Sequence, residues 1–441
     1  MSILLSIFIT ISFLALLASN SWMAENSYYF YATQFAVYSI FILYRLRYLS
    51  MVFAPSIVMF FFLGISFSLG SYFVPKEFGF LTAYYINELD EIKYHAFITF
   101  YYMNVFNILF FASCSLLDKQ ETIISHQRAI ASSQNDIKLF IAFMLLFLVS
   151  LKDLFFQFGI QVGLITFILF SISERRRLVK LICSILILAI MLTFNHENKR
   201  EIIVVLMLIS FVYSMSKKTT FKLLSPKIFS YISILVVFFS LVLSASILRG
   251  YGKFEATSFI DALILIPDYM ALDIFWDSLI DNFEISHTYP SSILPVDYVL
   301  SGKLSILAGT TIIKPLFLLI PREVWESKPE SMIYIFTETH SPGLFTNLGV
   351  SIPISLPGEL FSNFHVMALP VFIALVMLLN YCFLLIFNKQ INSLKRMLCC
   401  SASILFFILV RGSGLDLYIM TLLCALAAIF LLSINKKGVI K

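Results

Sequence analysis

Long runs of apolar residues are the feature of this sequence that most limits what it can fold into. Blocks such as ILLSIFITISFLALLA (3–18) and FSYISILVVFFSLVLSASIL (229–248) approach the length of about 20 residues that a helix needs to cross a bilayer. The chain is 60% hydrophobic and only 13% charged, whereas soluble domains carry about 25% charged residues. Because a lipid-facing chain must satisfy its own backbone hydrogen bonds, we expect an all-α, polytopic integral membrane protein.

The apolar blocks divide the chain into three regions. Residues 1–248 contain about nine predicted spans, residues 249–365 form one large loop, and residues 366–441 contain about three more spans. Within the loop, SFIDALILIPDYMALDIFWDSLI is apolar with Asp at intervals, which suits helices that lie on the membrane surface. The predicted spans are 3–18, 29–44, 52–74, 95–117, 138–155, 158–173, 178–195, 201–216, 229–248, 366–387, 398–412 and 417–434.

One further apolar segment, SILAGTTIIKPLFLLI (305–320), is barely long enough to span and has Lys314-Pro315 in its middle. Proline interrupts the hydrogen bonding of a helix. Counting this segment as a span would also move the basic C-terminal segments to the outside, against the usual charge bias. We therefore expect a re-entrant or interfacial helix here.

Basic residues indicate how the spans are oriented. Loops on one side of the predicted bundle contain roughly three times as many Lys and Arg as the short loops on the other side, and the positive-inside rule places the basic side in the cytoplasm. Both termini are then expected in the cytoplasm and the large loop outside. The net charge of +5 records this orientation and indicates no nucleic-acid partner. No cysteine lies in the large loop, so no disulfide framework is expected there.

The sequence lacks the motifs of several common chemistries. It has no Walker-type glycine-rich loop, no HExxH and no CxxC, and the large loop has no Asp-x-Asp. These absences argue against an ATP-driven pump, a zinc hydrolase and a metal-dependent nucleotide-sugar enzyme. We expect neither a cofactor nor a metal.

Cations at the external ends of predicted helices are the first candidate site residues. The large loop contains about twice as many acidic as basic residues, so its few cations stand in an acidic setting. Each one alone fits a side chain that snorkels to the interface. As a set they suit a phosphate group, which Arg and Lys bind through charge-assisted hydrogen bonds. The set consists of Arg200, Arg249, Arg322, Lys328 and Arg411.

The stretch SLPGELFSNFH (355–365), just before the span at 366, supplies a candidate base. Glu359 stands close to the membrane surface and suits proton abstraction from a sugar hydroxyl; a helix cap or a salt bridge to one of the arginines is the alternative. Asn363 and His365 follow as candidate glycan-binding residues, although His365 alone also fits an interfacial histidine. In the loop, Trp325 is placed either to stack on a sugar ring or to anchor the loop in the membrane.

These stretches resemble a known family. PREVWESKP (321–329) and GELFSNF (358–364), in a late external loop, are similar to the proline–tryptophan–Lys-Pro and Gly-Glu-aromatic-Asn-Phe signatures of the O-antigen or oligosaccharide-repeat-unit polymerases, the Wzy group. NKREIIVVLMLI (198–209) is similar to that group's arginine at an external helix end. The resemblance covers the whole chain as architecture but only these three stretches as motifs. His365 departs from the group, in which glycine more usually follows.

The resemblance implies a metal-independent, lipid-linked glycosyltransferase of the GT-C type in the bacterial cytoplasmic (inner) membrane, with its active site facing the periplasm. Donor and acceptor would both be oligosaccharides on undecaprenyl pyrophosphate, and undecaprenyl pyrophosphate would leave. Glu359 would be the general base, with Arg322 and Arg249 as further catalytic residues. The five cations would hold the pyrophosphates.

The same resemblance leaves other functions open. An O-antigen ligase shares the large loop and the chemistry but uses a different acceptor. A flippase for lipid-linked oligosaccharides has about as many spans, although it needs cations inside the spans and short loops. A scaffold membrane protein is a further alternative. Membrane lipids are expected partners, and a chain-length regulator protein is left open as another.

Overall fold

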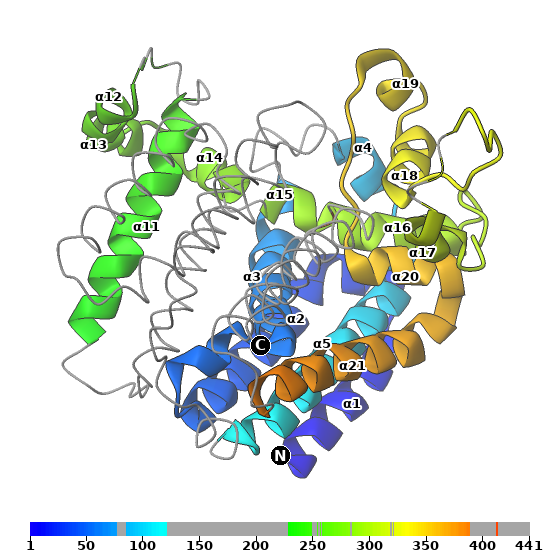
Figure 1. Cartoon of the computed structure of the whole chain (residues 1–441), viewed down its shortest axis with the longest axis horizontal. Coiled ribbons are helices and arrows are strands. Elements are labelled where there is room, and N and C mark those ends of the chain that lie inside the picture. Colours follow the sequence, from blue (N-terminus) through cyan, green and yellow to red (C-terminus); the bar gives the residue numbers. More distant parts are fainter. Residues whose placement is uncertain are drawn as a thin grey trace, which may run out of the picture.

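The computed structural model of the 441-residue chain describes residues 1–76, 85–120, 228–248, 258–282, 285–317 and 322–388, together with residues 254, 256, 320 and 412. Throughout these ranges the regular elements are helices and no strand is formed. The long helices between residues 2 and 117 and at 368–388 lie beside one another, and the short helices of the large loop gather towards one end of the long helices (Figure 1). The prediction of an all-α chain is confirmed for this part of the molecule.

Six predicted spans fall in the described ranges, and each coincides with a long helix. Within the described residues, three stretches are long and apolar enough to cross a membrane: Pro55–Lys76, His95–Leu117 and Leu356–Leu384. The six helices are α1 (Ser2–Leu17), α2 (Asn20–Arg45), α3 (Pro55–Phe73), α5 (His95–Leu117), α11 (Ile228–Leu248) and α21 (Ala368–Asn388). The predicted spans 138–155, 158–173, 178–195, 201–216, 398–412 and 417–434 lie outside the described residues, except for Gly412.

Helix α2 begins nine residues earlier than the apolar block predicted, at Asn20 instead of residue 29. Ser19 caps the helix by accepting a hydrogen bond from the Trp22 N–H at 3.3 Å. The first turns contain polar residues such as Glu25 and Asn26, which a search for apolar blocks excludes. The start of this helix is therefore set by its cap and not by its hydropathy.

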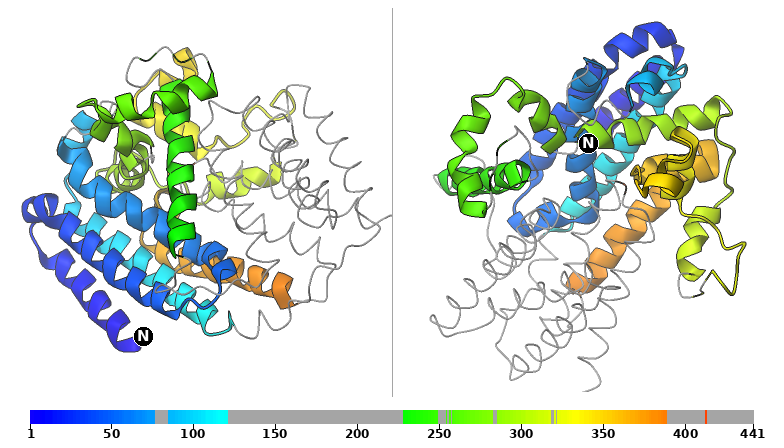
Figure 2. Two further views of the ribbon diagram at one scale, coloured as in Figure 1. Left: turned by 90° about the vertical axis from the view of Figure 1, so that its left-hand side faces the viewer. Right: turned by 90° about the horizontal axis from the view of Figure 1, so that it is seen from above.

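Helix α5 lies at the centre of the long helices and contacts α1, α2, α3 and α21. Seen from the side, α1, α2 and α5 run next to one another (Figure 2). Aromatic rings fill much of the space between them. Tyr38 of α2 stacks on Phe110 of α5 with ring centroids 3.8 Å apart, and Phe67 of α3 contacts Tyr102 of α5 at 4.4 Å.

Buried amides join these helices by hydrogen bonds. Asn380 of α21 donates through Nδ2 to Ser56 Oγ at 3.0 Å and to the Ala112 carbonyl at 3.1 Å. Its Oδ1 accepts from the Ser56 backbone N–H at 3.3 Å. Asn380 thus ties α21 to both α3 and α5. Between α2 and α5, Gln34 and Tyr38 both donate to Asn107 Oδ1, at 2.8 and 2.6 Å. Such interhelical hydrogen bonds hold helices together where lipid offers no hydrophobic drive between them.

The large loop contains short helices. The sequence preceding residue 283 forms α12 (Phe259–Ile264), α13 (Ile266–Met270) and α14 (Phe275–Asn282). Their buried residues pack with Leu243 and Ile247 of α11 in a cluster of their own. Ile260 and Ile264 of α12 stay exposed, which suits a helix lying on a membrane surface. The later helices are α15 (Ile285–Thr288), α16 (Pro290–Leu300), α17 (Thr310–Ile313), α18 (Met332–His340), α19 (Leu344–Leu348) and α20 (Leu356–Phe364).

The apolar segment 305–320 forms no long helix in its described part. It contains α17 followed by a 3₁₀ turn, Lys314–Phe317, which starts at the Lys314-Pro315 pair noted in the sequence. Neither piece is long enough to cross a membrane. The α-helix in this segment is therefore shorter than the re-entrant or interfacial helix that the sequence predicts, because proline ends the α-helical hydrogen bonding there.

Candidate functional site

Helix α20 carries two of the predicted site residues, and its start is strongly defined. Ser355 caps the helix by accepting a hydrogen bond from the Gly358 N–H at 3.3 Å, and Pro357 stands in the first turn, where its missing N–H costs nothing. Glu359 also lies in this first turn, where the helix dipole favours a negative charge. The helix ends at Phe364 because His365 takes a positive φ of 52°.

Helix α20 is held tightly against α16, and Gly358 makes this possible. A Cβ atom at Gly358 would lie 3.3 Å from the Pro295 ring and from the backbone carbonyl oxygens of Ser291 and Ser292. From the other side, the Tyr101 hydroxyl of α5 donates to the Pro357 carbonyl at 2.9 Å. The glycine in the GELFSNF stretch therefore serves packing, and it fixes the position of the glutamate that follows.

A buried polar cluster joins α20 to α17. The Thr311 hydroxyl donates to Glu359 Oε1 at 2.9 Å and accepts from Asn363 Nδ2 at 2.8 Å. Asn363 Nδ2 also lies 2.8 Å from the Glu359 carbonyl oxygen, to which it donates. All three side chains are at most 3% exposed. We call Thr311, Glu359 and Asn363 the Glu359 cluster.

Two backbone contacts hold α17 in place for this cluster. The Leu307 N–H donates to the Ser362 carbonyl at 3.0 Å. Gly309, with φ +87°, begins α17 and lies against the Phe364 ring, where a Cβ would be 3.5 Å from the nearest ring carbon. A residue with a side chain rarely adopts this backbone conformation. The chain reversal that brings Thr311 to Glu359 therefore depends on this glycine.

The Glu359 cluster has one polar atom to spare. Asn363 Oδ1 is buried and has no hydrogen-bond partner among the described residues. Buried polar atoms are nearly always paired, so an unpaired one marks either a local cost in stability or a place where a ligand binds. A carboxylate beside a spare acceptor suits a ligand with hydroxyl groups, because the carboxylate can take a proton and the amide oxygen can accept a hydrogen bond.

The two predicted cations of the large loop that the structure describes, Arg322 and Lys328, lie in a different segment. The exposed Arg322 guanidinium pairs with Glu330, with Nη2 2.6 Å from Oε2. Lys328 is nearly buried and donates from Nζ to the Ile320 carbonyl at 2.9 Å. Trp325 donates from Nε1 to Ser327 Oγ at 2.8 Å, and its ring meets the edge of Phe317. These contacts all lie within residues 317–330.

The remaining predicted residues are placed as follows. His365 is half-buried, with its ring centroid 5.0 Å from that of Phe361. Arg200, Arg249 and Arg411 lie outside the described residues. Gly412 accepts a hydrogen bond from the Ile354 N–H at 3.2 Å, so the residue after Arg411 lies beside the start of α20. Within the described residues, no group of three or more His, Cys, Asp or Glu side chains is arranged to hold a metal ion.

Sequence reasoning placed Glu359 and Asn363 together but missed Thr311. The pair is visible in the sequence because residues four apart share a helix face. Thr311 is 48 residues away from Glu359. It lies in an apolar segment whose length and proline indicate only how the segment is placed relative to the membrane. The available signal was a pair of threonines, 310 and 311, in an otherwise apolar run.

Sequence reasoning also missed a group of buried titratable residues near the C-terminal end of α16. The Tyr298 hydroxyl is 2.8 Å from His340 Nδ1, and His340 Nε2 is 3.9 Å from a Glu88 carboxylate oxygen of α4 (Ile86–Asp90). Next to it, Asp297 accepts hydrogen bonds from the backbone N–H groups of Lys93 and Tyr94, at 3.1 and 3.3 Å. Burial raises the pKa of the Asp297 carboxyl, although these two N–H groups oppose the effect.

Comparison with known proteins identifies no relative, since no family model, no curated protein and no solved structure matches this chain.

Proposed function

We propose that this chain is a membrane glycosyltransferase that joins lipid-linked oligosaccharide repeat units on the outer face of the bacterial cytoplasmic membrane. The observation that carries the proposal is the Glu359 cluster, a buried carboxylate with a spare amide acceptor at the start of the stretch Leu356–Leu384, which is apolar enough to span. The substrate class comes from the resemblance of three sequence stretches to the Wzy group.

In the proposed reaction, Glu359 accepts the proton of a hydroxyl on the acceptor repeat unit. That oxygen attacks the anomeric carbon of the donor glycan, the bond from this carbon to the pyrophosphate oxygen breaks, and undecaprenyl pyrophosphate leaves with the electron pair. Thr311 holds the Glu359 carboxylate in position through its 2.9 Å hydrogen bond. Asn363 Oδ1 accepts a hydrogen bond from a second hydroxyl of the acceptor.

The proposal assigns the pyrophosphate groups to the cations Arg200, Arg249, Arg322, Lys328 and Arg411. Of the two that the structure describes, Arg322 is about half exposed and pairs with one carboxylate. A guanidinium has five N–H donors, so this pairing leaves donors for a phosphate oxygen. Fixed positive charge at this point would offset the charge that develops on the leaving group.

The test uses purified full-length protein in liposomes with synthetic undecaprenyl-pyrophosphate-linked repeat units, without nucleotide sugar and with a chelator. We expect a ladder of lengthening glycans on a gel. Glu359→Gln should abolish the ladder, because glutamine keeps the shape and the bond from Thr311 but accepts no proton. Glu326→Gln, an exposed carboxylate of the same loop, should leave the ladder unchanged.

Two results would contradict the proposal. A ladder that Glu359→Gln leaves intact would remove the assigned base. The absence of any ladder from a verified native repeat would reject the polymerase, and two further arms would then separate the alternatives. Transfer of the glycan to added lipid A core would indicate a ligase, whereas movement of the substrate across the bilayer without transfer would indicate a flippase.

A further inference from the structure

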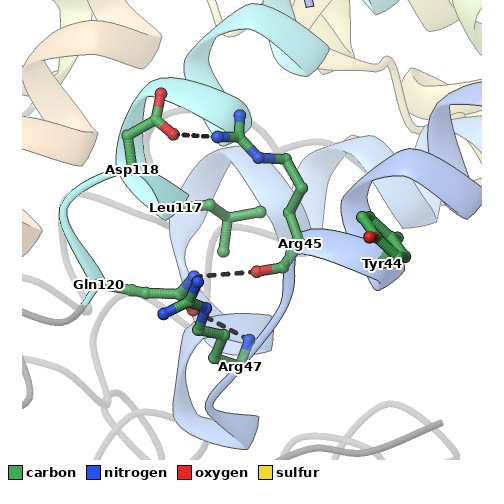
Figure 3. Close-up of a pocket in the computed structure, with 6 residues that line it drawn as sticks. All are labelled: Tyr44, Arg45, Arg47, Leu117, Asp118 and Gln120. Carbon is green, nitrogen blue, oxygen red and sulfur yellow. Dashed lines mark hydrogen bonds and ion pairs between the residues drawn. The ribbon is translucent and has the colours of Figure 1, made fainter.

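A pocket of about 340 Å³ lies where α2 and α5 end, on a part of the molecule that the proposed reaction does not use. Figure 3 shows its walls, which come from the last turn of α2, the residues after it and the end of α5. Since α5 is long enough to cross a membrane, a pocket at its C-terminal end lies near one surface of the bilayer. The lining residues are Tyr44, Arg45, Arg47, Leu117, Asp118 and Gln120.

The walls of the pocket are held in place by side chains of both helices. The Arg45 guanidinium pairs with the Asp118 carboxylate across the pocket. Gln120 donates from Nε2 to the Arg45 carbonyl at 2.9 Å and accepts the Arg47 backbone N–H through Oε1 at 3.0 Å. Figure 3 shows the ion pair and the two hydrogen bonds as dashed lines. The Arg45 side chain and the Arg47 backbone are thus held by Asp118 and Gln120, which follow α5.

The charge of the pocket suits an anion. Its described lining residues include two guanidinium groups, from Arg45 and Arg47, beside the Asp118 carboxylate. Each guanidinium offers five N–H donors in a planar fork, and one carboxylate partner leaves donors for a second anion. Arg binds phosphate oxygens well because this fork matches their geometry. A phosphate ester is the ligand chemistry that these walls fit best.

The surface beside the pocket indicates that the phosphate belongs to a lipid. Ile40 and Tyr44 lie one turn apart on the same face of α2 and are 70% and 86% exposed. Arg47 follows, also exposed. An aliphatic side chain and an aromatic ring on α2 are thus followed by a cation just past the end of the helix at Arg45. The same order is found across a bilayer leaflet, from acyl chains through the interface to the phosphate groups.

We propose that this pocket binds the headgroup phosphate of an anionic phospholipid, with an acyl chain of the same lipid lying along Tyr44 and Ile40. Basic pockets between transmembrane helices on the cytoplasmic side are suited to such headgroups. The positive-inside distribution of the sequence assigns this end of α2 to the cytoplasm. The lipid would tie the end of α2 to the end of α5, and its binding is independent of the proposed reaction.

The experiment measures lipid retention by native mass spectrometry. Full-length protein is released from nanodiscs that contain phosphatidylglycerol and phosphatidylcholine, and bound lipids are counted as a function of the phosphatidylglycerol fraction. We expect phosphatidylglycerol to be retained in preference to phosphatidylcholine. Arg47→Gln should lower its apparent affinity about fivefold, which corresponds to about 1 kcal/mol for one cation near the surface. High salt should weaken this preference.

Lys119→Gln is the matched control, because Lys119 is exposed, follows Asp118 directly and does not line the pocket. It removes the same charge from the same end of the molecule and should leave retention unchanged. Tyr44→Ala is a second variant for the case that Arg47→Gln folds poorly. It removes a highly exposed ring, so it should fold normally and still lose part of the bound phosphatidylglycerol.

Three outcomes would overturn the proposal. If Arg47→Gln and Tyr44→Ala both retain phosphatidylglycerol as the wild type does, the pocket has no role in binding. An equal loss in Lys119→Gln would show diffuse attraction by net charge instead of a site. A thermal shift with glycerol 3-phosphate that depends on Arg47, without any retention of phosphatidylglycerol, would show that the pocket takes a soluble phosphate ester.

Discussion

Two asparagines on the helical stretch Leu356–Leu384 use their buried amides in different ways. Asn380, in α21, has partners for both ends of its amide: Nδ2 donates to Ser56 and Ala112, and Oδ1 accepts from the Ser56 N–H. Asn363, in α20, uses only Nδ2, and its Oδ1 has no hydrogen-bond partner in the described part of the chain. Both side chains are at most 5% exposed.

Under the proposed function, the difference separates an amide that joins helices from an amide that binds substrate. A fully paired amide is what helix association in a bilayer requires, because every unpaired group there costs free energy. Asn380 meets this requirement and needs no ligand. At Asn363, the proposed function supplies a hydroxyl of the acceptor as the donor to Oδ1. Substitutions at the two positions should therefore have opposite effects on stability and on activity.

Among the substitutions that compare the two asparagines, Asn363→Leu should give the largest effect. The variant loses the two bonds made by Nδ2 but also removes the unpaired oxygen, so folding stability should change by less than about 1 kcal/mol. Under the proposed function it also loses a hydrogen bond to the acceptor, so the rate of chain extension should fall about 10- to 100-fold. A time course of the glycan ladder measures the rate, and thermal unfolding in detergent measures stability. A marked loss of stability with a normal rate per folded molecule would make Asn363 a second structural clamp.

Asn380→Leu should show the reverse pattern. It removes three hydrogen bonds that tie α21 to α3 and α5 and leaves the Ser56 hydroxyl with fewer partners. We expect a loss of about 1–2 kcal/mol in stability, seen as a lower Tm, with the rate per folded molecule unchanged. Tyr381→Leu is the control, since its side chain is exposed and next in sequence. A normal Tm for Asn380→Leu would contradict the clamp.

Thr311→Val tests the contact that links the two helices of the Glu359 cluster. Valine keeps the shape of threonine but removes the donor to Glu359 and the acceptor for Asn363. Stability should fall by about 1 kcal/mol, and the extension rate should fall with it because the carboxylate is no longer held in position. Thr310→Val, at an exposed neighbouring position, should have neither effect. Equal results for the two threonines would remove Thr311 from the site.

The sequence predicts the long helices well and the tertiary contacts of the site poorly, for a physical reason in each case. An apolar block reports directly on burial in lipid, so the ends of α3, α5, α11 and α21 fall close to the predicted spans. The start of α2 depends on the Ser19 cap, which hydropathy does not detect. Twelve spans and the GT-C arrangement stay predictions, as does the orientation of the chain.

In the candidate site too, the sequence predicts some contacts and not others. Glu359 and Asn363 are four residues apart on one helix, so their proximity follows from helix geometry. Thr311 reaches them through a chain reversal at Gly309, which no local pattern specifies. The pairing of Arg322 with Glu330 was also not predicted, because exposed ion pairs leave little trace in sequence.

Asp297→Asn should give the smallest effect, and it tests whether a buried polar group outside both asparagine sites is structural. Burial raises the pKa of this carboxyl, so the fold disfavours its ionised form and the group lowers stability at pH 7. Asparagine keeps an acceptor for the Lys93 and Tyr94 N–H groups without the charge. The variant should therefore unfold at an equal or slightly higher temperature at pH 7, and its advantage should shrink as the pH falls towards the raised pKa.

Glu338→Gln should do the opposite, because the backbone N–H of Gly343 and the Thr346 side chain lower the pKa of Glu338. The charge of Glu338 favours the fold above its ordinary pKa, so its removal should lower the Tm at pH 7 and matter less in acid. Thermal unfolding between about pH 3 and 8 measures both variants. If Asp297→Asn is clearly less stable at pH 7, the attraction of Lys93 and Lys303 outweighs the cost of burial, and the raised pKa of Asp297 is contradicted.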